Sequence, residues 1–393
     1  MKRQEGLLVG LLLGLLWSSA VYAQEPRAPG APSLASPAAV LMDAASGEVL
    51  LAKNPHEVRN PASVTKLMTL AVVYDAVARG EVGWDDPVTA SQRAQDMGGS
   101  QVFLAAGETF PLKDLVAAIA ISSANDAAVA VAEGIAGSEE AFVLRMEELA
   151  RQIGLKDSRF KNVHGLDEEG HGMSAMDIAL LSRYLVNRHP EILQLTRTWM
   201  QTFRPAPKEF ILVNTNTLLK RYPGVDGLKT GWTSPSGWSV AITAQRGTTR
   251  LIAVVMGART SDERWKDITA MLDWGFANFE SVVAARQGAT VRMIPVDEGV
   301  ERRVAAVVPD TLAVTLRKGE SQKVRQTIQL PQRVKAPVKK GQVLGTLTLE
   351  VDGKPVKTVN LVAGDDVKRL SFGGLWLRIF ASLWPWQQEA GRP

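Results

Sequence analysis

The chain has 393 residues, of which 22% are charged and 46% hydrophobic, and its net charge is +4. These values are ordinary for a globular protein, so they exclude wholesale disorder, and the length allows a large domain with a smaller one. The chain has no cysteine and four histidines, which excludes disulfides, thiol catalysis and cysteine metal sites. The histidines are dispersed and form no HExxH motif, so we expect neither a metal site nor a cofactor.

The N-terminus has the pattern of an export signal. Basic residues precede an apolar run that ends at Leu16, and small residues then lead to the sequence VYA at 21–23. This pattern predicts a signal peptide over 1–23 and a flexible leader over 24–33. The alternative is a membrane-spanning anchor, but the run is shorter than the roughly 20 residues that a span needs. An exported chain without cysteine suits a bacterial envelope protein.

Residues 34–283 mix strand and helix patterns. A strand pair with a turn at Ser46-Gly47 comes first, and a second apolar pair meets at RGTT, residues 246–249. Apolar residues recur at helical spacing between the pairs, and a long helix closes the region. This order predicts an α+β domain in which an antiparallel sheet lies between helices on both faces. The expected helices cover 61–79, 111–121, 123–136, 139–153, 174–188 and 261–279.

Residues 284–370 alternate apolar and polar side chains at period two, and Asp352-Gly353 is a typical hairpin turn. We therefore expect a small all-β domain. It holds 16 Lys and Arg against 9 Asp and Glu, a net of +7, whereas the rest of the chain has 29 against 32, or −3. This basic region favours an anionic membrane surface. Nucleic acid is not expected as a partner, because an exported protein does not meet it in quantity.

Residues 371–393 form a tail with an apolar stripe. A helix over 372–384 would be about 20 Å long, too short to cross a bilayer, and its tryptophans favour the headgroup boundary. We expect an amphipathic helix that attaches the protein peripherally to a membrane surface. The alternative is a helix docked on the protein's own core. The stripe consists of Leu375, Trp376, Ile379, Phe380, Leu383 and Trp384.

Ser63 and Lys66 open an apolar helix three residues apart, so their side chains share one helix face. A serine hydroxyl is a weak nucleophile that needs a nearby base. Lys66 can be that base if burial and a second cation, such as Lys229, lower its pKa. The first turn of a helix also favours negative charge, so the N–H of Ser63 could supply half of an oxyanion hole.

Two further motifs follow along the chain, S-x-N at Ser123–Asn125 and K-T-G at Lys229–Gly231. Each motif is weak alone, because Ser123 and Asn125 can simply cap helices and a lysine can simply be solvated. Together and in this order, S-x-x-K, S-x-N and K-T-G resemble the signature of penicillin-binding proteins and serine β-lactamases. The set therefore favours one catalytic site built from three distant segments.

Within that superfamily, the chain from about residue 34 onward resembles the low-molecular-weight D-alanyl-D-alanine carboxypeptidases. The resemblance implies a serine peptidase that removes the terminal D-Ala from peptidoglycan pentapeptides and binds β-lactams covalently. It further implies a bacterial periplasmic enzyme at the outer face of the inner membrane. The stretches that carry it are NPASVTKLMT, ISSANDAAVAVAE, HGLDEEGHGMSAMDIALLSRYL, GVDGLKTGWTSPSGWSVAITA and LIAVVMGA.

The resemblance also implies a role for each motif residue. Ser63 would be the acyl-enzyme nucleophile, Lys66 the proton acceptor and Ser123 a proton relay to the leaving amine. The N–H groups of Ser63 and Trp232 would form the oxyanion hole. Asn125 would bind the substrate amide, and the other contacts would meet the terminal carboxylate. The expected substrate-binding residues are Asn125, Lys229, Thr230, Gly231, Trp232, Thr233 and Arg264.

Two other functions compete with this interpretation. A β-lactamase of the same fold would place a glutamate in a loop after S-x-N, where Glu168 and Glu169 lie, but their sequence HGLDEEGHG is similar to the carboxypeptidase pattern. A cell-wall-binding scaffold without catalysis would not need an intact set of motif residues. Both alternatives fit the sequence less well than the carboxypeptidase.

The chain departs from the family pattern at Ala124, where glycine is usual, and at Trp232, where histidine is common. Tryptophan keeps the backbone donor but removes an imidazole from the site. We therefore expect Trp232→His to change hydrolysis of the acyl-enzyme more than its formation. Stopped-flow acylation and deacylation rates would measure this difference, and equal shifts in both rates would contradict it.

Overall fold

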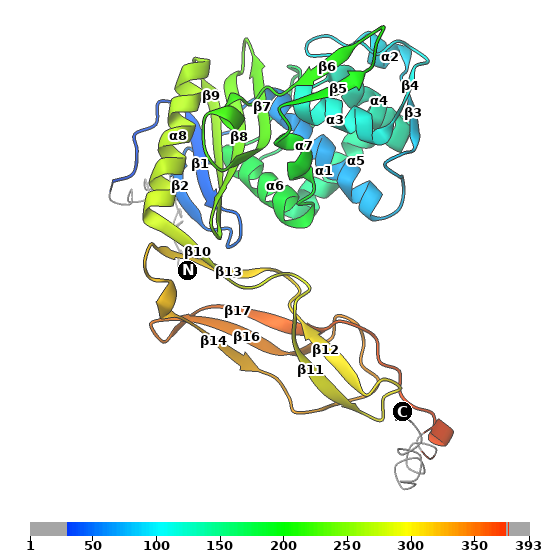
Figure 1. The fold of residues 1–393 in the computed structure, drawn as a ribbon, viewed down its shortest axis with the longest axis vertical. Coiled ribbons are helices and arrows are strands. Elements are labelled where there is room, and N and C mark those ends of the chain that lie inside the picture. The colour runs from blue at the N-terminus through cyan, green and yellow to red at the C-terminus, as the bar shows by residue number, and fades with distance from the viewer. Residues whose placement is uncertain (1–29, 375, 377–393) are drawn as a thin grey trace, which may run out of the picture.

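The computed structural model describes residues 30–374 and 376, and it shows an α+β domain followed by an elongated all-β domain (Figure 1). This architecture confirms the fold class predicted from the sequence. The predicted signal peptide and most of the predicted leader and membrane-anchor tail lie outside the described residues. Within 30–374 and at 376, no helix combines the length and the apolar character needed to cross a membrane.

The α+β domain is built on an antiparallel sheet with the strand order β2-β1-β9-β8-β7. Its central strands are buried on both faces, as expected for a sheet between two helical layers. In β1, Val40 and Met42 pack into one hydrophobic cluster, whereas Ala39 and Leu41 pack into another on the opposite face. The strands are β1 (Ala38–Asp43), β2 (Val49–Lys53), β7 (Val225–Thr233), β8 (Gly237–Arg246) and β9 (Thr249–Ala258).

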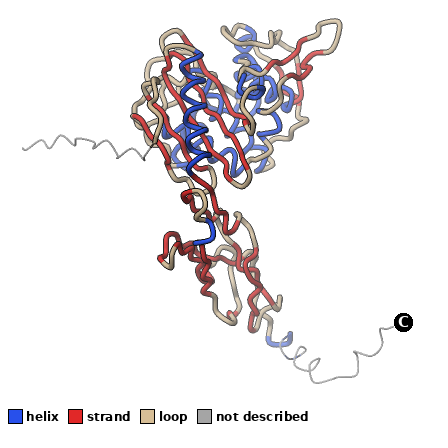
Figure 2. The backbone as a smooth tube through the Cα atoms, turned by 60° about the vertical axis from the view of Figure 1, so that its left-hand side comes forward, coloured by secondary structure: helices blue, strands red, loops and turns tan. Residues whose placement is uncertain are grey.

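Helices cover both faces of this sheet. The long helix α8 (Ser261–Asn278) lies along one face, and the remaining helices gather on the other (Figure 2). Two short strand pairs, β3–β4 and β5–β6, border the helical layer. The helices of that layer are α1 (Lys66–Ala78), α2 (Gln92–Gln95), α3 (Leu112–Ser122), α4 (Asn125–Ala136), α5 (Glu139–Ile153), α6 (Ala175–Arg188) and α7 (Ile192–Thr196). The short strands are β3 (Pro87–Thr89), β4 (Thr109–Pro111), β5 (Met200–Arg204) and β6 (Phe210–Val213), and the 3-10 turns are η1 (Ala62–Thr65) and η2 (Thr217–Lys220).

The all-β domain has a six-stranded sheet in the order β14-β16-β17-β12-β11-β15. Its core contains Leu347, Leu349 and Leu361, which are almost fully buried. The hairpin turn expected at Asp352-Gly353 joins β16 to β17. The strands of this part are β10 (Phe279–Ala285), β11 (Thr290–Asp297), β12 (Arg303–Val307), β13 (Leu312–Arg317), β14 (Val324–Gln329), β15 (Val334–Lys335), β16 (Val343–Val351) and β17 (Lys354–Ala363), with the 3-10 turn η3 (Ser321–Lys323).

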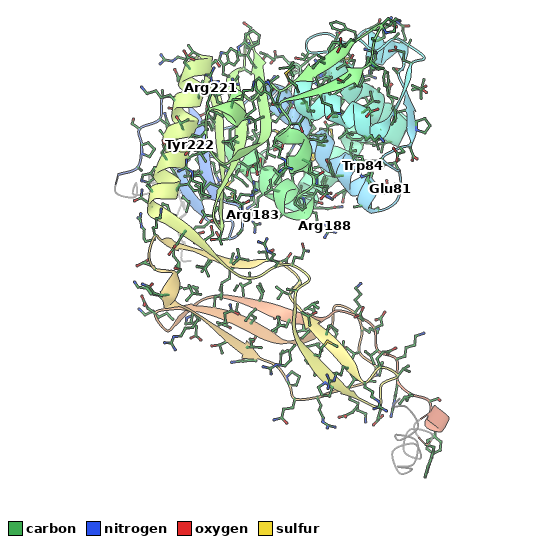
Figure 3. All side chains as sticks on the ribbon, viewed as in Figure 1. Glu81, Trp84, Arg183, Arg188, Arg221 and Tyr222 are labelled. Atoms are coloured by element: carbon green, nitrogen blue, oxygen red, sulfur yellow. The ribbon has the colours of Figure 1, made fainter. Side chains whose placement is uncertain are left out.

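Strand β10 joins the two parts without a linker, because it follows α8 directly and pairs with β13. Side-chain bonds reinforce the junction: the Ser46 and Thr315 hydroxyls are 2.6 Å apart, and Lys357 donates to the Ser46 carbonyl at 3.3 Å. Arg183 of α6 lies at the edge of the α+β domain that faces the β domain (Figure 3) and donates to the carbonyl of Ala44 at 3.0 Å. The contacts of Ser46 with Thr315 and Lys357 tie the two parts together, whereas the bond from Arg183 to Ala44 lies within the α+β domain.

Candidate active site

The segment that carries Ser63 is a tight 3-10 turn rather than the first turn of the α-helix expected from the sequence. Turn η1 spans Ala62–Thr65, and α1 begins only at Lys66. Ala62, the first residue of this turn, has a left-handed backbone with φ of 49°, so an α-helix cannot extend back through it. Its N–H donates to the Asn60 side-chain oxygen at 2.8 Å. Ser63 is thereby presented next to the N-terminus of α1.

Lys66 is fully buried, and its amine lies 3.0 Å from the Ser63 hydroxyl. It also donates to the Asn125 side-chain oxygen at 2.6 Å and to the His164 carbonyl at 2.7 Å. These three partners account for the three N–H bonds of an ammonium group. When the amine is neutral, two donated bonds can hold it in place while its lone pair accepts the Ser63 proton.

The two buried lysines have lowered pKa values. Burial, followed by the charge of Lys229, holds the pKa of Lys66 well below its usual range, and Asp126 opposes this effect. Burial, followed by the charge of Arg264, lowers the pKa of Lys229 to about 7. Both causes disfavour the charged form of an amine. The structure therefore places a buried amine with a lowered pKa beside Ser63, with Lys229 as the neighbouring second cation.

The S-x-N motif forms the turn between α3 and α4. Ser123 has a left-handed backbone with φ of 64° and is 4% exposed. Asn125 begins α4, and its amide nitrogen donates to the Gly98 carbonyl at 2.7 Å, which turns its oxygen toward Lys66. The side chain of Asn125 thus binds Lys66 and the Gly98 loop instead of capping α4, whose N-cap is Ala124.

The K-T-G motif lies on β7, the edge strand next to the helical layer (Figure 1). A Cβ atom on Gly231 would lie 2.6 Å from the Pro61 oxygen and 3.1 Å from the Ser63 nitrogen. A real Cβ atom does not come that close to backbone atoms. Only glycine at position 231 therefore allows β7 to contact the turn of Ser63. Lys229 is 1% exposed, and its amine donates to the Thr230 carbonyl at 3.0 Å.

Trp232 and Arg264 stand at the end of the site toward α8. Trp232 is 53% exposed and packs on Trp238, with 5.4 Å between ring centroids. The Arg264 guanidinium covers Trp238 at 4.8 Å and Trp265 at 4.1 Å. Burial lowers the pKa of Arg264 to about 10, so the group stays charged at neutral pH. The aromatic rings hold this buried cation next to the K-T-G strand.

Sequence reasoning missed the contribution of the loop after α5. Its His164 carbonyl receives the Lys66 amine, and a Cβ atom on Gly165 would lie 1.9 Å from the Ala62 oxygen. Asp167, from the same loop, accepts the hydroxyl proton of Thr233 at 3.0 Å. A backbone carbonyl has no sequence signature. Gly165 and Asp167, in contrast, could have been identified from the stretch HGLD, residues 164–167.

Other polar groups of this loop take part in structural bonds. Burial, followed by the charge of Lys66, lowers the pKa of His164 to about 3, and burial lowers that of His171 to about 4, so both rings are neutral near pH 7. Glu168 accepts a bond from Asn162 of its own loop at 2.9 Å. Across 30–374 and 376, no three His, Asp or Glu side chains are grouped as metal ligands.

Two family models match this chain. The family described as D-alanyl-D-alanine carboxypeptidase matches residues 24–260, and penicillin-binding protein 5, C-terminal domain, matches 279–369. D-alanyl-D-alanine carboxypeptidase DacF of Bacillus subtilis (strain 168) is 39% identical over 368 residues, which cover 93% of this chain and 94% of that protein. DacC of Escherichia coli (strain K12) is 34% identical over 390 residues, covering 97% and 96%.

A solved structure of penicillin binding protein 5 from Haemophilus influenzae matches with a TM-score of 0.70 and 34% identity, covering 86% of this chain and 99% of that one. The chain therefore belongs to the D-alanyl-D-alanine carboxypeptidase family. It is a hydrolase of the peptidase class with the fold of a low-molecular-weight penicillin-binding protein. This confirms the resemblance drawn from the three motifs.

Proposed function

We propose that the protein removes the terminal D-Ala from peptidoglycan pentapeptides through an ester on Ser63. The observation that carries this proposal is the fully buried Lys66 amine, 3.0 Å from the Ser63 hydroxyl and with a lowered pKa. A neutral amine at hydrogen-bond distance is the base that a serine nucleophile needs. β-Lactams, which mimic the D-Ala-D-Ala end, would acylate the same residue.

In the acylation step, Lys66 takes the hydroxyl proton while the Ser63 oxygen attacks the carbonyl carbon of the penultimate D-Ala. The oxyanion that forms would accept bonds from the N–H groups of Ser63 and Trp232, which the close approach of Gly231 to the Ser63 nitrogen brings together. The C–N bond then breaks. The leaving amine of the terminal D-Ala takes a proton that passes from Lys66 through Ser123.

Substrate binding would use the remaining motif residues. The Asn125 amide would bind the peptide, and the substrate carboxylate would meet Lys229, Thr230 and Arg264. Thr233 was expected at this carboxylate too, but its hydroxyl donates to Asp167, so the proposal leaves it out. In deacylation, water adds to the ester carbonyl and gives a proton to Lys66; the ester C–O bond then breaks, and Lys66 passes that proton to the Ser63 oxygen.

We propose an exported protein that acts in cell-wall remodelling from the bacterial periplasm, with a peptidase domain that begins at residue 34, a β domain that ends at 370 and an anchor tail over 371–393. The described start of the tail, at 372–374, lies at the end of the β domain far from the α+β domain (Figure 1). A tail bound to the outer face of the inner membrane would then hold the peptidase domain away from that surface.

The central experiment compares the wild type with Ser63→Ala. The wild type should release free D-Ala from a pentapeptide and retain a fluorescent penicillin, whereas Ser63→Ala should lose both by at least about 1000-fold, because the nucleophile is gone. A wild-type chain that forms no adduct would favour the scaffold. An adduct that is lost rapidly, with turnover of the penicillin, would favour the β-lactamase.

Activity should depend on pH through both lysines. The rate must rise as Lys66 loses its proton and fall as Lys229, with a pKa of about 7, loses the charge that holds the carboxylate. A bound carboxylate stabilises the Lys229 charge, so the alkaline limb of kcat should lie at higher pH than that of kcat/KM. In Lys229→Arg, whose guanidinium keeps its charge, the alkaline limb of kcat/KM should move to higher pH. An unchanged limb would show that Lys229 does not set it.

Membrane attachment is tested by removing the tail. A chain that ends at Lys368 lacks the apolar stripe and should stay in solution after vesicles of anionic lipid are sedimented, whereas the full chain should pellet with them. Hydrolysis of a D-Ala-D-Ala peptide should be the same in both chains, which serves as the control for folding. If the shortened chain still pellets with the vesicles, the tail is not the attachment site.

A further inference from the structure

One oxygen atom of Asp167 joins the two walls of the active site. Its Oδ1 accepts three hydrogen bonds, from the Asn60 amide at 2.5 Å, the Thr233 hydroxyl at 3.0 Å and the Ser236 hydroxyl at 3.2 Å. Asn60 lies just before the turn of Ser63, and Thr233 is the last residue of β7. This carboxylate and these three bonds take no part in the proposed proton transfers.

On the nucleophile side, Asp167 fixes the orientation of the Asn60 amide. The nitrogen of that amide donates to Asp167, and its oxygen accepts the N–H of Ala62 at 2.8 Å. Ala62 holds the left-handed backbone, φ of 49°, that sets the direction of the Ser63 turn. A non-glycine residue keeps such a backbone only where its surroundings enforce it. Without Asp167, the amide can rotate away and release the Ala62 N–H.

On the strand side, Asp167 fixes the hydroxyl of Thr233. The Thr233 oxygen accepts the Ser236 N–H at 3.2 Å and contacts the Ser236 hydroxyl, and it lies 3.0 Å from Asp167 as a donor to the carboxylate. Thr233 directly follows Trp232, whose N–H is the proposed second oxyanion donor. The bond from Thr233 to Asp167 therefore restrains the end of β7 at the position where that donor must be aligned.

Other residues of the loop that carries Asp167 also contact the turn of Ser63. The His164 carbonyl accepts a hydrogen bond from the Lys66 amine at 2.7 Å. Gly165 packs so closely against the Ala62 oxygen that there is no space for a Cβ atom. Asp167 extends this contact from the turn across to β7. The loop, the turn and the strand are thus joined through one side chain.

We propose that Asp167 is a positioning residue for acylation, and that Thr233 is its partner on β7. By holding Asn60 and Thr233 through one atom, Asp167 keeps the N–H groups of Ser63 and Trp232 directed at the same oxyanion. This inference rests on the proposed acyl-enzyme function. It concerns hydrogen bonds rather than charge, because all three bonds end on Oδ1, which an asparagine also has.

The experiment measures acylation of the full-length protein by a fluorescent penicillin, as a second-order rate constant, in Asp167→Ala, Asp167→Asn and Ser236→Ala. Asp167→Ala should acylate about 10-fold or more slowly, since small misplacements of reacting groups carry large rate costs. Asp167→Asn should stay within about threefold of the wild type, because its oxygen can still accept all three bonds. Ser236→Ala is the control: it removes a hydroxyl that contacts both Asp167 and the Thr233 hydroxyl, while the bonds of Asn60 and Thr233 to Asp167 stay in place.

The thermal midpoint of unfolding is measured as a control for folding. It should change by only a few degrees in Asp167→Ala because Asp167 is exposed. Wild-type rates in Asp167→Ala would overturn the proposal, and so would an Asp167→Asn variant as slow as Asp167→Ala, which would assign the effect to charge. Ser236→Ala as slow as Asp167→Ala would assign it to the turn after β7 instead. Failure of the proposed function is distinct, because the wild type itself would then form no adduct.

Discussion

The structure of the site depends on keeping one amine, that of Lys66, out of water and beside a hydroxyl. An exposed lysine amine is protonated near neutral pH and cannot accept the proton of Ser63. Burial and the neighbouring charge of Lys229 lower its pKa, but a buried amine is tolerated only where its donors are satisfied. The side-chain oxygen of Asn125 and the carbonyl of His164 accept hydrogen bonds from this amine at 2.6 and 2.7 Å. The Lys66 amine is therefore held beside Ser63 by segments that lie far apart in the chain.

The segments around Lys66 can come this close only where backbone contacts backbone directly. This requirement explains the positions of two glycines. Gly231 and Gly165 both face the turn of Ser63, and a Cβ atom on either would overlap its backbone oxygens. At Gly165 the backbone is also left-handed, with φ of 85°, so glycine serves both geometry and space there. Side chains on these two residues would hold the loop and the strand apart and admit water to the amine, which would return its pKa toward the usual value.

The sequence predicted the groups whose chemistry depends on a side chain. The Ser63–Lys66 pair, Asn125 and Lys229 follow from motif spacing. The strand pairs β1–β2 and β8–β9 follow from their apolar patterns, because a two-sided core fixes which residues must be buried. It did not predict the 3-10 turn, since nothing in NPASVTK announces a left-handed Ala62. It also missed the His164 carbonyl, because any residue type offers a carbonyl, and Asp167, because its donors lie 107 and 66 residues away in the chain.

The β domain matters to the site through geometry rather than chemistry. Strand β10 continues from α8 without a linker, and the Ser46–Thr315 contact of 2.6 Å ties the first β-turn of the α+β domain to β13. Asp43, at the end of β1, is also bonded to Ser281 of β10. Because these bonds start from the same sheet whose edge strand carries Lys229, the direction of the β domain is fixed relative to the active site. Under the proposed membrane attachment, a rigid connection of this kind would set the distance and the direction at which the site meets a polymeric substrate, whereas a flexible linker would leave both undefined.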